Sequence, residues 1–213
     1  MNTINTSSAK PSTPRPLIIL LSGPSGVGKD TVISKIREQD SSIFVTVNVT
    51  TRSIRSCEID GLDYIFTNKN EFDRMIKANM FLEHANVYGN HYGVPKDQVI
   101  SALSRGQDAL IKADVQGAKT IMQIEPNVLS IFLMPESTLA LERRLTLRMT
   151  ESKQALKTRL KTAISEINQA NNFEYIVYNK DGCITETVRE IKRIINNEKT
   201  RIPPRIVKIL NPE

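Results

Sequence analysis

The chain has few of the residues that metal centres, disulfide frameworks and membrane spans require. It contains only two cysteines and two histidines. Cys57 and Cys183 lie far apart and match no zinc-binding spacing, so we interpret both as free thiols in a reducing compartment. No apolar run approaches the ~18–20 residues that cross a bilayer, and residues 1–15 lack the apolar core of a secretory signal. The sequence therefore predicts no membrane partner. We expect a cytoplasmic protein, and the N-terminal extension leaves an organellar location open.

The positive charge of the chain is not concentrated in any one segment. The 213 residues carry a net charge of +6, which would suit nucleic acid, a membrane surface or phosphorylated small molecules. Lysine and arginine form no continuous tract, which favours polyphosphate chemistry over nucleic-acid binding. The length suits one globular domain with inserted subdomains, and we find no internal repeat.

A glycine-rich stretch, LSGPSGVGKDT at Leu21–Thr31, organises the rest of the chain. Gly23, Gly28 and Lys29 have the spacing of a phosphate-binding loop, G-x-x-x-x-G-K-[ST]. Backbone N–H groups and a helix N-terminus in such a loop bind phosphate oxygens. The predicted ligand is a nucleoside triphosphate, contacted by Gly23, Pro24, Ser25, Gly26, Val27, Gly28, Lys29, Asp30 and Thr31. The loop alone does not identify an acceptor.

The alternation of strands and helices predicts the fold class. Apolar runs at 17–21, 43–49, 109–114, 128–134 and 175–178 predict buried strands, with helical patterns between them. This order favours an α/β fold with a parallel sheet core and ligands at the carboxyl ends of the strands. The predicted domain spans residues 17–200, and its core is formed by 17–47 and 99–200. Short strands and a hairpin at about 48–98 predict an inserted subdomain, 146–158 a mobile lid, and 1–16 and 201–213 tails.

The inserted segment contains the candidate acceptor residues. Arg52 and Arg55 follow the second predicted strand and would clamp a phosphate bidentately, or else form a solvated charged loop. Glu83 follows two apolar residues in a strand, where alternation would place it in a slot or on the surface. In a slot, its carboxylate would accept two hydrogen bonds from a guanine edge. Adenine presents an acceptor in place of the guanine N1–H and would be rejected.

At this point the chain resembles the guanylate kinase family, whose members transfer the γ-phosphoryl group of ATP to GMP. The resemblance spans about residues 17–199. It rests on several motifs in the family's order: GPSGVGK at 23–29, TTRSIR at 50–55, E-x-DG-x-DY-x-F at 58–66, FLEHA at 81–85, YGNHYGV at 88–94, DVQGA at 114–118 and ERRL at 142–145. It implies a P-loop nucleoside monophosphate kinase fold, with a GMP-binding subdomain and a mobile lid.

The resemblance also assigns roles to individual positions. It implies that the GMP phosphate is held by Arg52 and Arg55, helped by Tyr64 and Tyr92, and that Glu83 reads the guanine edge. Asn48 and Val94 are implied in GMP binding at positions where the family usually has hydroxyl residues touching the base, and Asp114 is implied at the base-binding end of the site. It implies that ATP is closed over by Arg144, Arg148 and Arg159, with Asn179 near the adenine. The residues implied in catalysis are Lys29, Arg52, Arg148 and Arg159. The implied substrates are ATP with Mg²⁺ and GMP or dGMP, and the protein would act as a monomer or homodimer.

Two charged positions near the phosphate loop depart from the family pattern. Asp30 stands where a serine or threonine usually binds magnesium, and Lys112 replaces an acidic residue common at the end of the third core strand. We hypothesise that Asp30 takes over magnesium coordination and that Lys112 pairs with Asp30 or with a phosphate. Two alternative functions remain at this stage. One is a non-catalytic guanylate kinase-like module that binds proteins. The other is a ribose 1,5-bisphosphate phosphokinase, which shares the fold and has an aspartate at this loop position.

Overall fold

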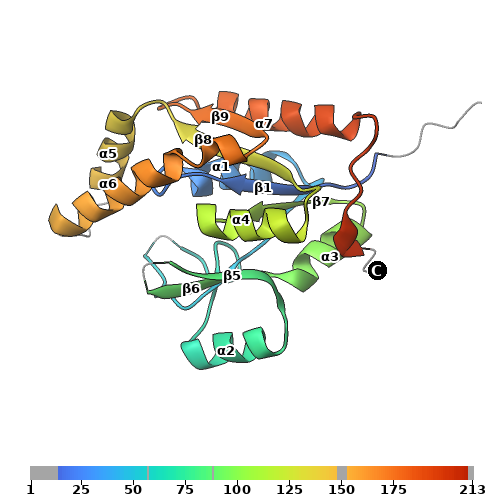
Figure 1. Ribbon diagram of the computed structural model, residues 1–213, viewed down its shortest axis with the longest axis horizontal. Coiled ribbons are helices and arrows are strands. Elements are labelled where there is room, and N and C mark those ends of the chain that lie inside the picture. Colours follow the sequence, from blue (N-terminus) through green and yellow to red (C-terminus); the bar gives the residue numbers. More distant parts are fainter. Residues whose placement is uncertain (1–13, 57, 88, 148–152, 211–213) are drawn as a thin grey trace, which may run out of the picture.

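A five-stranded parallel sheet forms the centre of the protein (Figure 1). The computed structural model describes residues 14–56, 58–87, 89–147 and 153–210. The strand order is β2-β7-β1-β8-β9, with bounds Ile18–Ser22 (β1), Ile43–Val45 (β2), Asp108–Lys112 (β7), Leu129–Pro135 (β8) and Tyr175–Asn179 (β9). The predicted parallel α/β fold is confirmed. The chain leaves β1 toward β2 and later reaches β8 on the other side of β1. The carboxyl end of β1 is therefore the switch point at which ligands bind.

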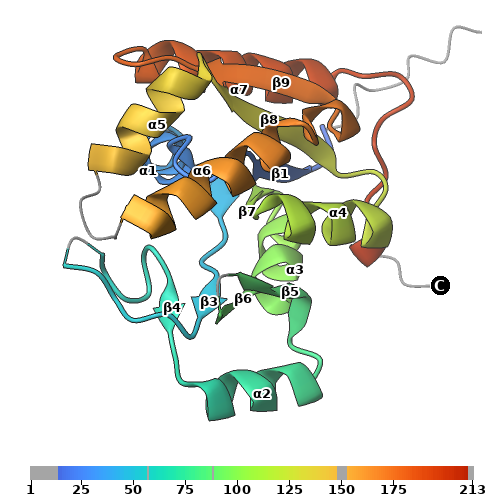
Figure 2. The same cartoon turned by 60° about the vertical axis from the view of Figure 1, so that its left-hand side comes forward.

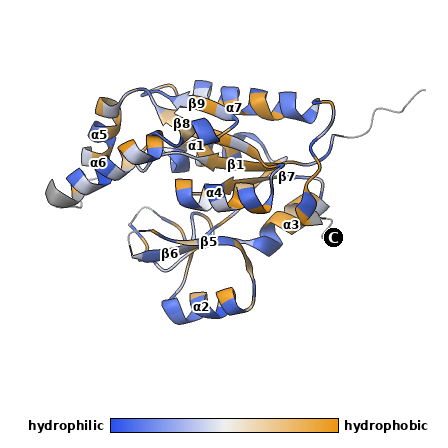
Figure 3. Ribbon diagram, in the orientation of Figure 1, coloured by the Kyte–Doolittle hydropathy of each residue, from blue (hydrophilic) through white to orange (hydrophobic). Residues whose placement is uncertain are grey.

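Both faces of this sheet are buried by helices. Ile19 and Leu21 of β1 pack with side chains of α1 (Lys29–Gln39) and α7 (Ile184–Lys199). The alternate residues Ile18 and Leu20 pack with side chains of α3 (Lys96–Ser104) and α4 (Val115–Ile124) on the opposite face. Figure 3 shows β1 and β7 as apolar strands between helices of mixed hydropathy. A strand buried on both faces reads as a continuous apolar run, which explains why β1 is recognisable from sequence.

A second, smaller sheet lies beyond α4 (Figures 1 and 2). Its order is β4-β3-β6-β5, with bounds Val49–Thr50 (β3), Ile65–Phe66 (β4), Phe81–Val87 (β5) and Asn90–Pro95 (β6). Helix α2 (Lys69–Lys77) packs on it through Phe72, whose ring stacks on Phe81 at a centroid distance of 4.7 Å. Asn68 caps α2 by accepting a hydrogen bond from the Glu71 N–H. All four strands come from the segment assigned to the inserted subdomain.

The expected strand 43–49 is wrong as a single element. It divides into β2 and β3, which belong to different sheets. Between them, the Gln98 side chain accepts a hydrogen bond from the Val47 N–H and donates one to the Val47 carbonyl. A side chain thus replaces the strand ladder at Val47, and both backbone polar groups of this residue stay paired as the chain leaves the parallel sheet. β-branched residues indicate an extended chain, but they do not indicate which sheet it joins.

Helices α5 (Thr138–Leu147) and α6 (Lys153–Ile167) form the region of the predicted lid. They pack together through an apolar cluster that includes Leu141, Leu145 and Ala163. Residues 148–152, at the centre of the predicted lid, lie outside the described residues. Helix α6 ends at Ile167, and a short 3₁₀ helix follows it at Ala170–Asn172.

One of the two cysteines, Cys183, lies in the described part of the chain. Cys183 is a free thiol as expected, while Cys57 lies outside the described residues. Within the described ranges, every helix is too short or too polar to cross a bilayer.

Residues 201–210, the described part of the expected C-terminal tail, pack on the domain through Arg205. The side chain of Arg205 is only 5% exposed. Its guanidinium donates to Glu198 at 2.6 Å and to Glu174 at 2.9 Å, and also to the Val128 carbonyl. A buried arginine with two carboxylate partners ties this segment to α7 and to the start of β9.

Replacing Arg205 with alanine should destabilise the fold. Glu198 would be left buried with its main cationic partner missing, which costs about 3 kcal/mol in free energy of unfolding. Arg201→Ala is the matched control, because Arg201 is half exposed and lies 3.6 Å from the same carboxylate. Its loss should cost less than about 1 kcal/mol. Urea denaturation of both variants measures the difference, and equal costs would contradict the anchoring role of Arg205.

Candidate functional site

The phosphate loop follows β1 and opens helix α1. Gly28 has φ of +100°, and a Cβ added there would lie 2.7 Å from the Asn179 Nδ2 atom. Glycine is therefore required both by backbone conformation and by close packing. The Lys29 ammonium donates hydrogen bonds to the Gly23 and Pro24 carbonyls, which folds it back along the loop. Burial lowers the pKa of Lys29, and nearby carboxylates oppose that shift.

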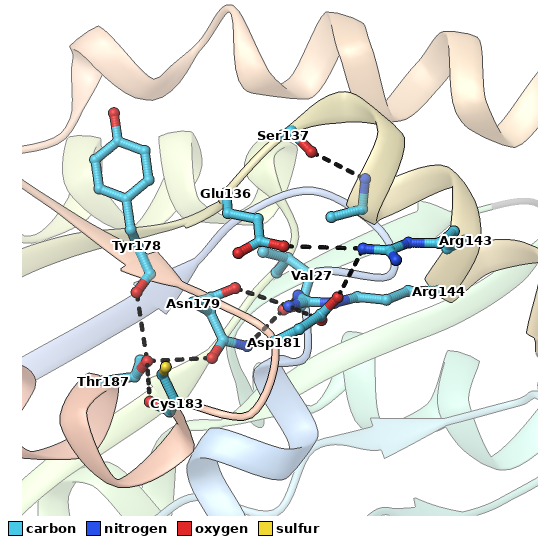
Figure 4. Close-up of polar contacts among 11 residues, drawn as sticks. Val27, Glu136, Ser137, Arg143, Arg144, Tyr178, Asn179, Asp181, Cys183 and Thr187 are labelled. Atoms are coloured by element: carbon cyan, nitrogen blue, oxygen red, sulfur yellow. Dashed lines mark hydrogen bonds and ion pairs between the residues drawn. The ribbon is translucent and has the colours of Figure 1, made fainter.

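Two side chains hold the loop from the side of β9 and α5 (Figure 4). The Val27 carbonyl accepts hydrogen bonds from Asn179 Nδ2 and Arg144 Nη1, each at 2.8 Å. Arg144 also donates to the Asn179 carbonyl and forms an ion pair with Asp181. Figure 4 shows Arg143 reaching the same aspartate from α5. These contacts fix the loop, and contact of Arg144 or Asn179 with ATP stays a prediction.

A cavity of about 800 Å³ joins the phosphate loop to the second sheet. The predicted site residues that line it are Ser25, Gly26, Val27, Gly28, Lys29, Asp30, Asn48, Arg52, Arg55, Tyr64, Glu83, Tyr92, Asp114 and Arg159. The predicted residues that do not line it are Gly23, Pro24, Thr31, Val94, Arg144 and Asn179. Arg148 lies outside the described residues. Residues far apart in sequence therefore meet around one space, with loop residues at one end and acceptor candidates at the other.

Arg52 and Arg55 differ in how they are held. Both guanidinium Nη atoms of Arg52 bond to Glu58, at 2.9 and 2.8 Å, and both side chains are 12% exposed. The guanidinium carbon of Arg52 also lies 5.2 Å from the Tyr64 ring centroid. The side chain of Arg55 is 54% exposed and 3.7 Å from Glu58. Arg52 is thus an oriented cation in the cavity wall, not a solvated loop residue.

Glu83 lies in a slot and not on the surface. It is 7% exposed and packs against the first turn of α4. A Cβ on Gly117 would lie 2.8–3.0 Å from the Glu83 carboxylate atoms, so only glycine fits there. Burial raises the pKa of Glu83 to about 7, and the negative charge of Asp114 adds to the shift. Asp114 caps α4 by accepting from the Gln116 and Gly117 N–H groups.

Two further predicted GMP-binding residues, Val94 and Asn48, lie in the second sheet and directly before one of its strands. Val94 pairs with Glu83 across β5 and β6, and Asn48 immediately precedes Val49, which pairs with Gly93. The Asn48 amide donates to the Lys112 carbonyl at 2.7 Å, so its orientation is fixed. Val94 is fully buried in the apolar cluster beneath the cavity. It therefore supports the floor of the site without facing the open space.

Lys112 bridges the two ends of the cavity. Its ammonium lies 2.7 Å from the Asp30 carboxylate and 4.0 Å from the Tyr64 ring centroid. The pairing with Asp30 that the sequence suggested is confirmed. Burial disfavours the charged form of Lys112, but the Asp30 charge and the Tyr64 contact outweigh it and raise the pKa of the lysine.

Glu166 is a site residue that the sequence reasoning missed. It lies on α6 and accepts a hydrogen bond from the Ser25 N–H at 2.9 Å. The Ser25 hydroxyl oxygen lies 3.2 Å from the Arg159 guanidinium, which comes from the same helix. Glu166 is the only acidic residue among the 15 of α6, and that isolation was the available signal.

The residues present fit a magnesium ion that is held mainly by nucleotide phosphates. Within the described ranges, no group of three or more histidine, cysteine or acidic side chains forms a metal site on its own. Asp30 is 57% exposed beside the loop and offers one carboxylate. Magnesium characteristically takes one or two carboxylates together with phosphates and water. Asp30 is the carboxylate of the loop itself, and its metal role stays a prediction.

The fold and this site define a P-loop nucleoside monophosphate kinase: a parallel sheet with a phosphate loop at its switch point and a second sheet across the cavity. A family model described as Guanylate kinase matches residues 13–198. The chain belongs to the guanylate kinase family.

Curated relatives and a solved structure agree with that assignment. Guanylate kinase 2, chloroplastic/mitochondrial, of Oryza sativa subsp. japonica is 41% identical, over 92% of this chain and 69% of its own. The guanylate kinase of Rickettsia felis is 39% identical, over 87% of this chain and 95% of its own. The crystal structure of guanylate kinase from Anaplasma phagocytophilum superposes with a TM-score of 0.74 at 34% identity, covering 89% of each chain.

Glu83→Gln should stabilise the protein in alkaline solution and not in acid. The pKa of Glu83 is raised in the folded state, so the ionised side chain destabilises the fold increasingly as pH rises from about 4.5 to 7. The gain at pH 8 should be about 3 kcal/mol in free energy of unfolding and should shrink toward zero at pH 4.5. Denaturation at the two pH values measures it, with Glu190→Gln, whose side chain is half exposed, as control. A gain that does not depend on pH would contradict this account.

Proposed function

We propose that this chain catalyses transfer of the γ-phosphoryl group of ATP to GMP, and to dGMP, giving ADP and the nucleoside diphosphate. One observation carries the proposal: Glu83 lies in a buried slot of the same cavity that opens onto the phosphate loop. This arrangement suits two nucleotides bound with their phosphates facing each other. The reaction would recycle GMP in purine nucleotide metabolism.

Guanine recognition follows from the chemistry of the Glu83 slot. An ionised carboxylate accepts hydrogen bonds from the guanine N1–H and the exocyclic amino group at the same time. Adenine presents a ring acceptor at N1, which would face the carboxylate without a proton between them. Because the slot is buried, such a mismatch leaves polar groups unpaired and disfavours AMP strongly. Bound guanine would also favour the ionised form of Glu83, which burial alone disfavours.

The phosphoryl transfer itself requires positioning and charge compensation. A phosphate monoester is already a nucleophile at neutral pH, so no strong general base is needed. The difficulty is to bring two anionic groups into line and to stabilise the charge that is shared between them. Lys29 and Arg159 lie at the ATP end of the cavity and Arg52 at the acceptor end. Arg148 is proposed to join them when the lid closes, and closure would exclude water.

Magnesium, when bound with ATP, would neutralise phosphate charge and orient the terminal phosphates. We propose that Asp30 supplies its protein carboxylate in place of the usual hydroxyl. The pairing of Asp30 with Lys112 supports a coupled replacement, because the two charges offset each other beside the loop.

We further propose a cytoplasmic protein that acts as a monomer or homodimer, without nucleic-acid or membrane partners. The name of the rice relative places that protein in chloroplasts or mitochondria. Imaging of the full chain carrying a C-terminal fluorescent tag would separate a cytoplasmic from an organellar location.

A coupled assay of ADP formation tests the acceptor. We expect turnover with GMP and dGMP, little with AMP, and none with ribose 1,5-bisphosphate. Glu83→Gln should raise the KM for GMP by about 100-fold or more, because the amide presents a donor to the guanine edge. The KM of the unmodified protein should rise as pH falls below 7, where Glu83 becomes protonated. Turnover of the sugar alone, or of no acceptor, would contradict the proposal.

A pair of substitutions tests the coupled replacement at Asp30 and Lys112. Asp30→Ser should raise the magnesium concentration needed for half-maximal rate, because the proposed carboxylate ligand is removed. It should also lower turnover, because Lys112 loses its carboxylate partner. The double variant Asp30→Ser, Lys112→Asp restores the family's hydroxyl and carboxylate and should recover most of the activity. Magnesium titrations of the ADP-forming rate measure both. Unchanged magnesium dependence in the single variant would refute a metal role for Asp30.

A further inference from the structure

Glu166 places a carboxylate against the glycine-rich loop, on the wall of the cavity. Its Oε2 atom is 2.9 Å from the Ser25 backbone nitrogen, within the glycine-rich loop. Backbone N–H groups of such a loop are donors for phosphate oxygens. The side chain lines the same cavity as Lys29 and Arg159. A carboxylate oxygen therefore occupies a hydrogen-bonding position suited to a phosphate oxygen.

The charges around Glu166 resemble those that a terminal phosphate needs. Burial raises the pKa of Glu166 and the negative charge of Asp114 adds to that shift, while the Ser25 N–H and the positive charges of Lys29 and Arg159 favour the ionised carboxylate. Lysine of the loop is the residue that reaches the outer phosphates of a bound nucleotide. The Glu166 carboxylate and a phosphate group are both negatively charged. They would repel each other strongly if both lay at the Ser25 N–H and beside the same cations. Glu166 and a γ-phosphate therefore exclude each other at this position.

We propose that Glu166 is a positioning residue that stands in for the γ-phosphate when no triphosphate is bound, and that ATP has to displace it. This inference rests on the proposed function, since it assumes that ATP enters through the phosphate loop. Before ATP arrives, the carboxylate holds the Ser25 N–H, and through α6 it ties the lid to the loop. ATP would take over the Ser25 donor and release Glu166 toward solvent.

The displacement acts on ATP and ADP unequally. ADP has no γ-phosphate and can bind while Glu166 keeps its contact with Ser25. ATP binds only if the contact between Glu166 and Ser25 is broken. Glu166 therefore weakens the binding of ATP and leaves the binding of ADP unchanged. A contact that is kept with one ligand bound and lost with the other changes the ratio of the two dissociation constants by the free energy of that contact. Such a device would prevent ATP from being held too tightly in the absence of an acceptor.

Nucleotide affinities of Glu166 variants test this inference without GMP. Calorimetric titration with Mg-ATP and with Mg-ADP should show that Glu166→Ala lowers the Kd of ATP about tenfold, the equivalent of one hydrogen bond to a charged group. The Kd of ADP should stay within about twofold of the original value. Glu166→Asp keeps the charge but retracts it by one methylene, so it should resemble the alanine variant. Glu190→Gln, on the outer surface of α7, serves as the matched control and should change neither affinity.

The possible results are distinguishable. If Glu166 only stabilises the fold, its variants will have a lower melting temperature, and the Kd values of ATP and ADP will rise equally. That result overturns the inference. If neither affinity changes, the contact with Ser25 has no role in binding and the inference also fails. If the unmodified protein binds no ATP, the proposed function fails instead. A lower Kd of ATP together with an unchanged Kd of ADP supports the displacement of Glu166 by ATP.

Discussion

Positive charge that is buried without a partner is costly, and the cavity of this protein is arranged around that constraint. Each end needs cations for phosphate groups, yet the cations have to be stable before substrates bind. The structure meets this need with internal carboxylates: Glu58 for Arg52, Asp30 for Lys112, and Glu166 beside Lys29 and Arg159. Substrate phosphates would then exchange partners with these groups, and no isolated charge would have to be created.

The helical and strand content of the core was predictable because its signals are local. A strand buried on both faces, such as β1, is a continuous apolar run, and a capped helix such as α2 has its polar signature at Asn68. The division of residues 43–49 between two sheets was not predictable from the same kind of signal. It depends on Gln98, 51 residues away from the Val47 backbone that it satisfies. A β-branched run contains no information on that partner.

The candidate site shows the same division between local and distant information. The phosphate loop and the Arg52 and Glu83 positions were found from motifs, and the structure brings them to one cavity. Glu166 was missed because its partner, the Ser25 N–H, is 141 residues away and is a backbone group. Arg144 was recognised as an arginine of interest, but its contacts with Val27 and Asp181 could not be read from sequence. Contacts between side chain and distant backbone need the fold.

The double hydrogen bond at the Val27 carbonyl has a consequence for the rate of nucleotide capture. A flexible glycine-rich loop would lose conformational entropy on binding, and each ordered residue would weaken the complex. Here Asn179 and Arg144 order the loop from behind before any nucleotide arrives. Ordering of the loop itself would then add little delay to association. The glycines thus provide the shape of the loop, while β9 and α5 provide its rigidity.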